Sequence, residues 1–324
     1  MPRVLITGAA GFIGMHTAIR FLKEGWEVIG FDNLNSYYSV DLKNDRIKEV
    51  LTVAQKFNKK FIFYEADLNS NIWTSLLEDH FDAIIHLAAQ AGVRYSLENP
   101  KVYLESNVLG FQNVLDFVKL TQVDRFVYAS SSSVYGKNSI QPFNEKEDCN
   151  SPESYYAATK KMNELMAMSY HKNHNVSSIG LRFFTVYGPW GRPDMAPMLF
   201  ANAAYNNKAI KVFNHGNQSR DFTYIDDIVE GIFKLMLIPS FPIGADVCNI
   251  GNGSPVKLME FIDEIERVTN IELDKTFTKA QKGDVVNTYA DTLKLYRLTG
   301  YMPKTNLSLG IKEFIEWYKN YYKV

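Results

Sequence analysis

Short apolar runs alternate with amphipathic stretches through the first half of the chain. The apolar runs predict strands over residues 3–7, 27–31, 60–64, 83–87 and 125–129. Helical periodicity begins between them, near Phe12, Asp41, Asn71 and Val102. This alternation predicts right-handed βαβ crossovers, and therefore a parallel sheet with helices on both faces. We expect an α/β fold with a doubly wound, Rossmann-type parallel sheet.

The rhythm changes after a further predicted strand at residues 177–183. Residues 186–193 contain two glycines and two prolines, which predict a shaped loop facing a ligand rather than regular structure. Helices are then predicted over 200–206, 226–236 and 258–268, with short strands between them such as 210–213. We therefore expect a first domain over residues 1–183. A smaller α+β lobe should follow over residues 184–324, with segments that can return to the first domain.

Composition and charge narrow the class of protein. The 324 residues are 46% hydrophobic, enough for a large core, and the net charge of −1 gives no sign of nucleic acid or membrane-surface binding. Cys149 and Cys248 lie far apart, which predicts free thiols in a reducing compartment. With no signal segment or membrane-length apolar run, we expect a cytoplasmic protein. His171 and His174 lack partners at metal-ligand spacing, so we expect a solvated helix end and no metal.

A glycine-rich turn joins the first predicted strand to the first predicted helix. Gly8, Gly11 and Gly14 allow a tight turn and close approach of backbone amides to a pyrophosphate. The second strand ends at Asp32, whose carboxylate suits an adenosine ribose diol and repels a 2′-phosphate. Residues 33–35 supply no arginine to reverse that preference. The sequence therefore predicts a dinucleotide site that takes NAD.

Tyr156 and Lys160 lie four residues apart, on one face of a predicted helix. A lysine ammonium can lower the pKa of a nearby phenol, which would otherwise be a poor base at neutral pH. An isolated pair of this kind is usually ordinary helix surface. Together with the glycine turn it indicates redox chemistry at a sugar or alcohol carbon.

These motifs resemble the extended short-chain dehydrogenase/reductase family over almost the whole chain. The resemblance implies an NAD-binding domain, a nucleotide-sugar lobe and three catalytic residues: Tyr156 for proton exchange, Lys160 at the nicotinamide ribose, and a serine, for which we choose Ser131. Asp67 is expected near adenine, although a helix N-cap is an alternative. The cofactor residues that the resemblance implies are Gly8, Gly11, Phe12, Ile13, Gly14, Asp32, Asn33, Asn35, Asp67, Leu68, Leu87, Ala88, Ala89, Gln90, Asn107, Tyr156, Lys160 and Phe183.

The serine run separates reactions within this family. Dehydratases that resemble the chain carry Asp and Glu before Val-Tyr-Gly, and related decarboxylases keep the Glu, whereas this chain has Ser131, Ser132 and Ser133. Elimination of water would lack its acid and base, but removal and return of hydride at one carbon needs neither. The run therefore favours epimerisation.

Longer strings, over residues 87–96, 182–195 and 220–227, resemble UDP-glucuronate 4-epimerases. That resemblance implies a UDP-sugar substrate, UDP-glucuronate or UDP-galacturonate, with Arg220 at the diphosphate and Asp284 near uridine. The substrate residues implied are Arg94, Ser131, Ser132, Ser133, Thr185, Arg192, Arg220 and Asp284, of which Ser132, Ser133, Thr185 and Arg192 would hold the sugar carboxylate. Taken alone, Arg94 and Arg192 are as compatible with surface loops, and Asp284 with an ordinary loop aspartate.

Three other functions stay open at this point. They are 4-epimerisation of a neutral UDP-hexose or UDP-N-acetylhexosamine, decarboxylation of the uronate, and NAD sensing without catalysis. The intact glycine turn and Tyr/Lys pair disfavour the last. The segment over 102–120 and the helix of Tyr156 also resemble the four-helix dimer interface of this family, which implies a homodimer.

Overall fold

A seven-stranded, wholly parallel sheet forms the centre of the computed structural model, which describes residues 1–137, 139–280, 283 and 285–324. Its order is β11-β6-β5-β4-β1-β2-β3. The strands are β1 (Arg3–Thr7), β2 (Glu27–Asp32), β3 (Phe61–Glu65), β4 (Ala83–His86), β5 (Phe126–Ser131), β6 (Ser178–Phe183) and β11 (Ala245–Ile250). The predicted α/β doubly wound fold is confirmed.

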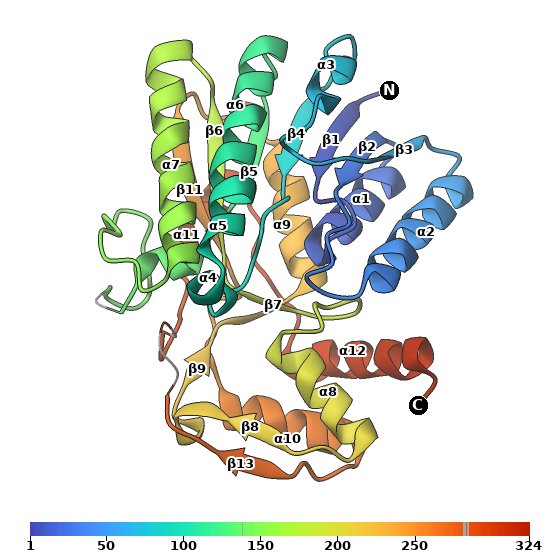
Figure 1. The fold of residues 1–324 in the computed structure, drawn as a ribbon, viewed down its shortest axis with the longest axis vertical. Helices are drawn as coiled ribbons and strands as arrows, with labels where there is room; N and C mark the ends of the chain where they lie inside the picture. Colours follow the sequence, from blue (N-terminus) through green and yellow to red (C-terminus); the bar gives the residue numbers. More distant parts are fainter. Residues whose placement is uncertain (138, 281–282, 284) are drawn as a thin grey trace.

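Helices cover both faces of this sheet because its strands are apolar on both sides. Val4 and Ile6 pack toward α1, α2 and α9, whereas Leu5 belongs to the core under α6 and α7. Figure 1 shows α6 and α7 side by side on one face. The helices that flank the sheet are α1 (Phe12–Lys23), α2 (Val40–Lys56), α3 (Ile72–Leu76), α6 (Gly110–Thr121), α7 (Tyr155–His174), α9 (Ile225–Leu237) and α11 (Leu293–Thr299).

Parts of the second half return to this sheet. β11 pairs with β6, and α9 packs on α1, so these segments share the first core. The remaining elements build a smaller lobe at the lower end of Figure 1, around a separate apolar core. They are β7 (Thr185–Tyr187), α8 (Ala196–Asn206), β8 (Ile210–Val212), β9 (Ser219–Arg220), β10 (Phe222–Tyr224), β12 (Val256–Lys257), α10 (Leu258–Thr269), β13 (Lys275–Phe277) and α12 (Leu307–Tyr322).

One local prediction is wrong. Residues 186–193 are not all loop, because Val186 and Tyr187 complete β7, which pairs in parallel with β10. Pairing with a distant segment overrides the local pattern there. The predicted helical segment over 102–120 is made of α5 (Pro100–Tyr103), a π-helical turn (Leu104–Leu109) and α6.

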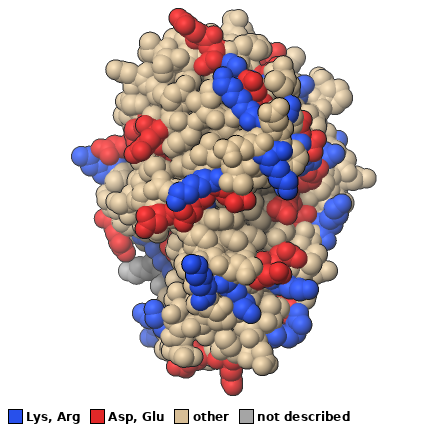
Figure 2. All heavy atoms as spheres, turned by 90° about the vertical axis from the view of Figure 1, so that its right-hand side faces the viewer, with Lys and Arg blue, Asp and Glu red and all other residues tan. Residues whose placement is uncertain are grey.

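The surface agrees with the neutral charge balance. On the face in Figure 2, basic and acidic side chains are interspersed over the molecule. Within the described residues, no helix combines the length and the apolar character needed to cross a bilayer.

Candidate active site

One cavity of about 750 Å³ gathers nearly all the predicted site residues. It lies where β1, β2, β4, β5 and β6 end, because the carboxyl ends of parallel strands meet at one edge of the sheet. Residues of the smaller lobe, among them Phe213 and Arg220, close its other side. Of the predicted residues, Asn107 does not line the cavity, and Asp284 lies outside the described residues.

The glycine turn leaves no room for side chains. Gly8 has φ +72°, and a Cβ there would lie 2.6 Å from the backbone nitrogen of Ala88. A Cβ on Gly14 would lie 2.0 Å from the carbonyl oxygen of Gly8. Helix α1 begins just after Gly11, which supplies no side-chain cap, and its first turn contains no acidic residue. Its amino end therefore suits an anionic pyrophosphate, so this chain fits a dinucleotide such as NAD.

The ribose side of the cavity is built by the loop after β2. Asp32 Oδ1 accepts from the backbone N–H of Leu34, and Asn33 Nδ2 donates to Asp67 Oδ2 at 2.7 Å. Burial raises the pKa of Asp32, against the opposing effect of the Lys43 ammonium. Lys43 is itself buried and donates to the side-chain oxygen of Asn35 at 3.0 Å. The loop thus presents carboxylates and amides toward the space where a diol would bind.

Asn107 acts behind the cavity wall. Its side chain is buried, accepts from the backbone N–H of Gln90 at 2.8 Å, and donates to the Gln90 carbonyl at 3.0 Å. Its backbone carbonyl accepts from Asn163 of α7. Asn107 therefore holds the segment after β4 against the helix that carries Tyr156.

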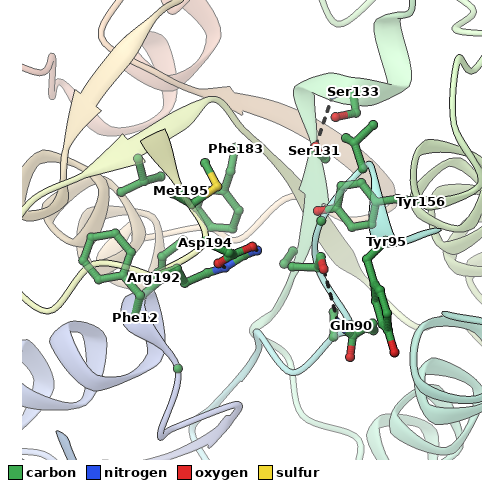
Figure 3. Close-up of a pocket in the computed structure, with 18 of the residues that line it drawn as sticks. Phe12, Gln90, Tyr95, Ser131, Ser133, Tyr156, Phe183, Arg192, Asp194 and Met195 are labelled. Carbon is green, nitrogen blue, oxygen red and sulfur yellow. Dashed lines mark hydrogen bonds and ion pairs between the residues drawn. The ribbon is translucent and has the colours of Figure 1, made fainter. Parts of the chain in front are cut away.

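Tyr156, Lys160 and Ser131 meet at the centre of the cavity. Figure 3 shows the Tyr156 hydroxyl directed toward Ser131, and Ser131 Oγ accepts from the backbone N–H of Ser133 at 3.1 Å. Lys160 is 2% exposed, and its ammonium donates to the carbonyl of Ala129 at 2.8 Å. Burial lowers the pKa of Lys160 to about 7. Helix α7 and the end of β5 therefore bring together a phenol, an amine and a hydroxyl.

The surroundings of Tyr156 favour its neutral phenol. Burial raises the pKa of Tyr156, and the hydrogen bond with Ser131 and the charge of Arg192 oppose this rise. The Lys160 ammonium lies 6.0 Å from the centroid of the Tyr156 ring. Lowering of the Tyr156 pKa by Lys160 together with an oxidised nicotinamide stays a prediction.

A buried ion pair supports this constellation from behind. Glu164, one turn beyond Lys160, accepts from Arg182 Nε and Nη2 at 2.9 Å each. It also accepts from Ser130 Oγ at 2.7 Å. The three side chains join α7 to β5 and β6 immediately next to Ser131 and Phe183.

Most of the other cationic side chains that line the cavity lie on the side where the nucleotide sugar is expected to bind. Arg220 Nη1 donates to the backbone carbonyl of Val286 at 2.7 Å, and the Arg94 guanidinium lies 4.8 Å from the centroid of the Phe213 ring, so it spans the cavity toward the smaller lobe. Thr185, Ser132 and Ser133 also line the cavity. The cationic lining residues within the described chain are Lys43, Arg94, Lys160, Arg192, Lys211 and Arg220. The acidic lining residues within the described chain are Asp32, Asp67, Glu98 and Asp194, so basic side chains outnumber acidic ones here although the whole chain is nearly neutral.

Several lining residues were not singled out from the sequence, among them four with polar or charged side chains: Tyr37, Lys43, Asp194 and Lys211. Asp194 forms an ion pair with Arg192, and Tyr37 donates to Asp194 at 3.2 Å. Asp194 could have been suspected, because it stands two residues after Arg192. The other three come from a loop, a helix and a strand that only the folded chain brings to this wall.

Comparisons with known proteins agree with this geometry. A model of the NAD dependent epimerase/dehydratase family matches residues 4–251. A probable UDP-glucuronate 4-epimerase of Rhizobium meliloti is 42% identical, over 99% of this chain and 98% of that protein. UDP-glucuronate 4-epimerase 2 of Arabidopsis thaliana is also 42% identical, over 99% of this chain and 76% of that protein. The crystal structure of a Bacillus cereus UDP-glucuronic acid 4-epimerase, in complex with UDP-glucuronic acid and NAD, is 32% identical with a TM-score of 0.89. The match covers 99% of this chain and 100% of that one.

Proposed function

Because this chain belongs to the NAD dependent epimerase/dehydratase family, we propose that it interconverts UDP-glucuronate and UDP-galacturonate by reversible oxidation at C4. The observation that carries the proposal is one cavity that holds the glycine turn, the group of Ser131, Tyr156 and Lys160, and Arg192. The first two suit a dinucleotide and an alcohol carbon, and the arginine suits a sugar carboxylate.

Tyr156 is the group that takes the proton of the C4 hydroxyl and returns it. NAD, when bound, supplies a hydride acceptor that takes the C4 hydrogen and gives it back to the same carbon. Ser131 shares a hydrogen bond with Tyr156 and so orients the phenol toward the reacting oxygen. Lys160 keeps its ammonium on the Ala129 carbonyl, on the same face of α7 as the phenol. A charge on Lys160 and the positive charge of an oxidised nicotinamide would lower the pKa of Tyr156 from its raised value.

Inversion requires the 4-keto sugar to turn over between loss and return of the hydride at C4. The diphosphate is the natural tether, and Arg220 offers a guanidinium fork for its oxygens. Thr185, Ser132, Ser133 and Arg192 would hold the carboxylate, which lies β to the ketone. Fixing its C5–C6 bond out of line with the carbonyl π system would prevent loss of carbon dioxide.

The pair of α6 and α7 is the proposed homodimer surface. Large apolar side chains on this part of the molecule are about half exposed, among them Leu109 at 52%, Leu120 at 65% and Leu165 at 53%. Apolar area of this kind is what a permanent subunit interface would cover. The cytoplasm is the proposed compartment, supported by Cys149 and Cys248, which are both buried and unpaired.

Chromatographic product analysis tests the function. Purified protein with NAD is incubated separately with UDP-glucuronate, UDP-glucose and UDP-N-acetylglucosamine, with Tyr156→Phe as the inactive control. We expect UDP-galacturonate from the first and no product from the others. Turnover of neutral sugars alone would overturn the carboxylate assignment, and a UDP-pentose as main product would make the chain a decarboxylase.

A further inference from the structure

Arg192, which is assigned to the substrate carboxylate, already forms an ion pair with Asp194 of this chain. Arg192 Nε donates to Asp194 Oδ1 at 3.1 Å, and Arg192 Nη2 donates to Asp194 Oδ2 at 2.5 Å. Both side chains line the cavity, and Figure 3 shows them next to each other, on the opposite side of the cavity from Tyr156. The ion pair is therefore made inside the site itself.

Tyr37 provides a second donor to this carboxylate. Its hydroxyl donates to Asp194 Oδ2 at 3.2 Å, and its ring packs 4.9 Å from that of Tyr95. Burial, followed by the charge of Asp194, raises the pKa of Tyr37 to about 12, so the phenol stays a neutral donor at physiological pH. Asp194 would thus keep one hydrogen bond if another anion took the arginine.

The geometry sets a competition for one guanidinium. Asp194 occupies the edge formed by Nε and Nη2, and a planar guanidinium offers only one further edge, between Nη1 and Nη2. A sugar carboxylate must either share Arg192 through that edge, beside a like charge, or displace Asp194. Repulsion or a broken ion pair opposes binding in both cases. A substrate with a neutral C6 group meets neither cost.

We propose that Asp194 is a specificity-determining residue, a resident counter-ion of Arg192 with which the substrate carboxylate must compete, and that Tyr37 retains Asp194 when the substrate takes the arginine. This proposal rests on the proposed function, because it requires the uronate carboxylate to bind at Arg192. It makes uronate binding looser than the arginine alone would allow. It also keeps the arginine neutralised and in place between turnovers.

The two side chains then have opposite effects on the same binding constant. Asp194→Asn keeps the shape and an acceptor oxygen but removes the charge, so UDP-glucuronate should bind about fivefold tighter or more. Tyr37→Phe removes the donor that holds displaced Asp194, so UDP-glucuronate should bind about threefold more weakly. In the Asp194→Asn background, Tyr37→Phe should have little further effect, because the charge that it holds is gone. A merely structural role would weaken binding in both variants.

Calorimetric titration of the NAD-loaded protein measures these constants. A Tyr156→Phe background prevents turnover, and the ligands are UDP-glucuronate, UDP-glucose and UDP. Because the three ligands share the diphosphate, the ratio of uronate to glucose affinity isolates the carboxylate. Glu98 lines the same cavity, so Glu98→Gln removes an equal charge as the matched control. It should leave that ratio unchanged.

The outcomes distinguish this proposal from the proposed function. If Asp194→Asn leaves the ratio unchanged or lowers it, while the wild type still converts UDP-glucuronate, Asp194 only braces Arg192 and the competition is refuted. If Asp194→Asn fails to fold, Tyr37→Phe decides the matter, since unchanged or tighter uronate binding would refute the proposal on its own. If the wild type converts only neutral sugars, the proposed function is refuted, and so is the proposal that Asp194 competes with the substrate carboxylate.

Discussion

Replacing Glu164 by glutamine should destabilise the protein strongly, although the two side chains have nearly the same shape. Glu164 and Arg182 are joined by two hydrogen bonds of 2.9 Å, and their side chains are only 4% and 2% exposed. Arg182 Nη1 already lacks a hydrogen-bond partner in the described part of the chain. The amide of glutamine would leave the guanidinium charge buried without a counter-ion and would point a donor at a donor.

The size of the effect follows from this burial. Breaking a buried pair by removing one partner costs about 3–5 kcal/mol. An unfolding entropy of about 2.1 cal/mol/K per residue, over 324 residues, gives about 0.7 kcal/mol/K, so Tm should fall by about 4–7 °C. Replacing both partners together, by Glu164→Leu with Arg182→Met, should recover much of that loss, because no buried charge then remains.

Thermal unfolding followed by circular dichroism checks this, with Glu260→Gln as the control. Glu260 of α10 forms an ion pair with Lys257 at 4.0 Å, and the two side chains are 58% and 77% exposed, so its variant should unfold near the wild-type temperature. Burial acts to raise the pKa of Glu164, but hydrogen bonding and charge from Arg182 bring it below the ordinary value. The stability gained from its ionised form is therefore fully present above about pH 4.3 and is lost as the pH falls through the folded-state pKa.

The difference in Tm between the wild type and Glu164→Gln should accordingly be largest at neutral pH, and it should become smaller as the pH falls. Two results would refute the reasoning. One is a variant that unfolds within about 1 °C of the wild type at neutral pH, far less than the cost of a broken buried pair. The other is a difference in Tm that grows as the pH falls, because this would mean that protonated Glu164 stabilises the fold better than the carboxylate.

Three further predictions concern the cofactor turn, the carboxylate pocket and the subunit surface. Gly14→Ala would place a Cβ 2.0 Å from the Gly8 carbonyl oxygen, so titration with NAD should show at least about a hundredfold loss of affinity; wild-type affinity would contradict the role of the turn. Thr185→Val should raise the UDP-pentose share of the product by loosening the carboxylate, measured by chromatography, whereas equal slowing of both products would contradict this. Leu165→Glu on α7, where Leu165 is 53% exposed, should yield monomers in light scattering. Leu309→Glu on α12, where Leu309 is 48% exposed, should leave the dimer intact, and a Leu165→Glu dimer would place the interface elsewhere.

Patterns that are local in the chain could be predicted well. The strand from Arg3 to Thr7 and the helix from Phe12 follow from short-range periodicity, and the glycine turn follows from steric limits on three positions. The Tyr156/Lys160 pair needed only helical spacing. Errors arose where distant segments decide the outcome, as at β7, which exists because β10 lies beside it.

The sequence by itself determined the fold class, the dinucleotide turn and the chemistry of the phenol, amine and hydroxyl, because each depends on residues close together in the chain or on strands that end at one edge. Only the tertiary structure decided that β11 completes the sheet, that Glu164 and Arg182 pair behind the serine run, and that Tyr37 reaches Asp194. The last contact joins positions 157 residues apart. Such contacts depend on how lobes and loops pack, and side-chain periodicity carries no record of that packing.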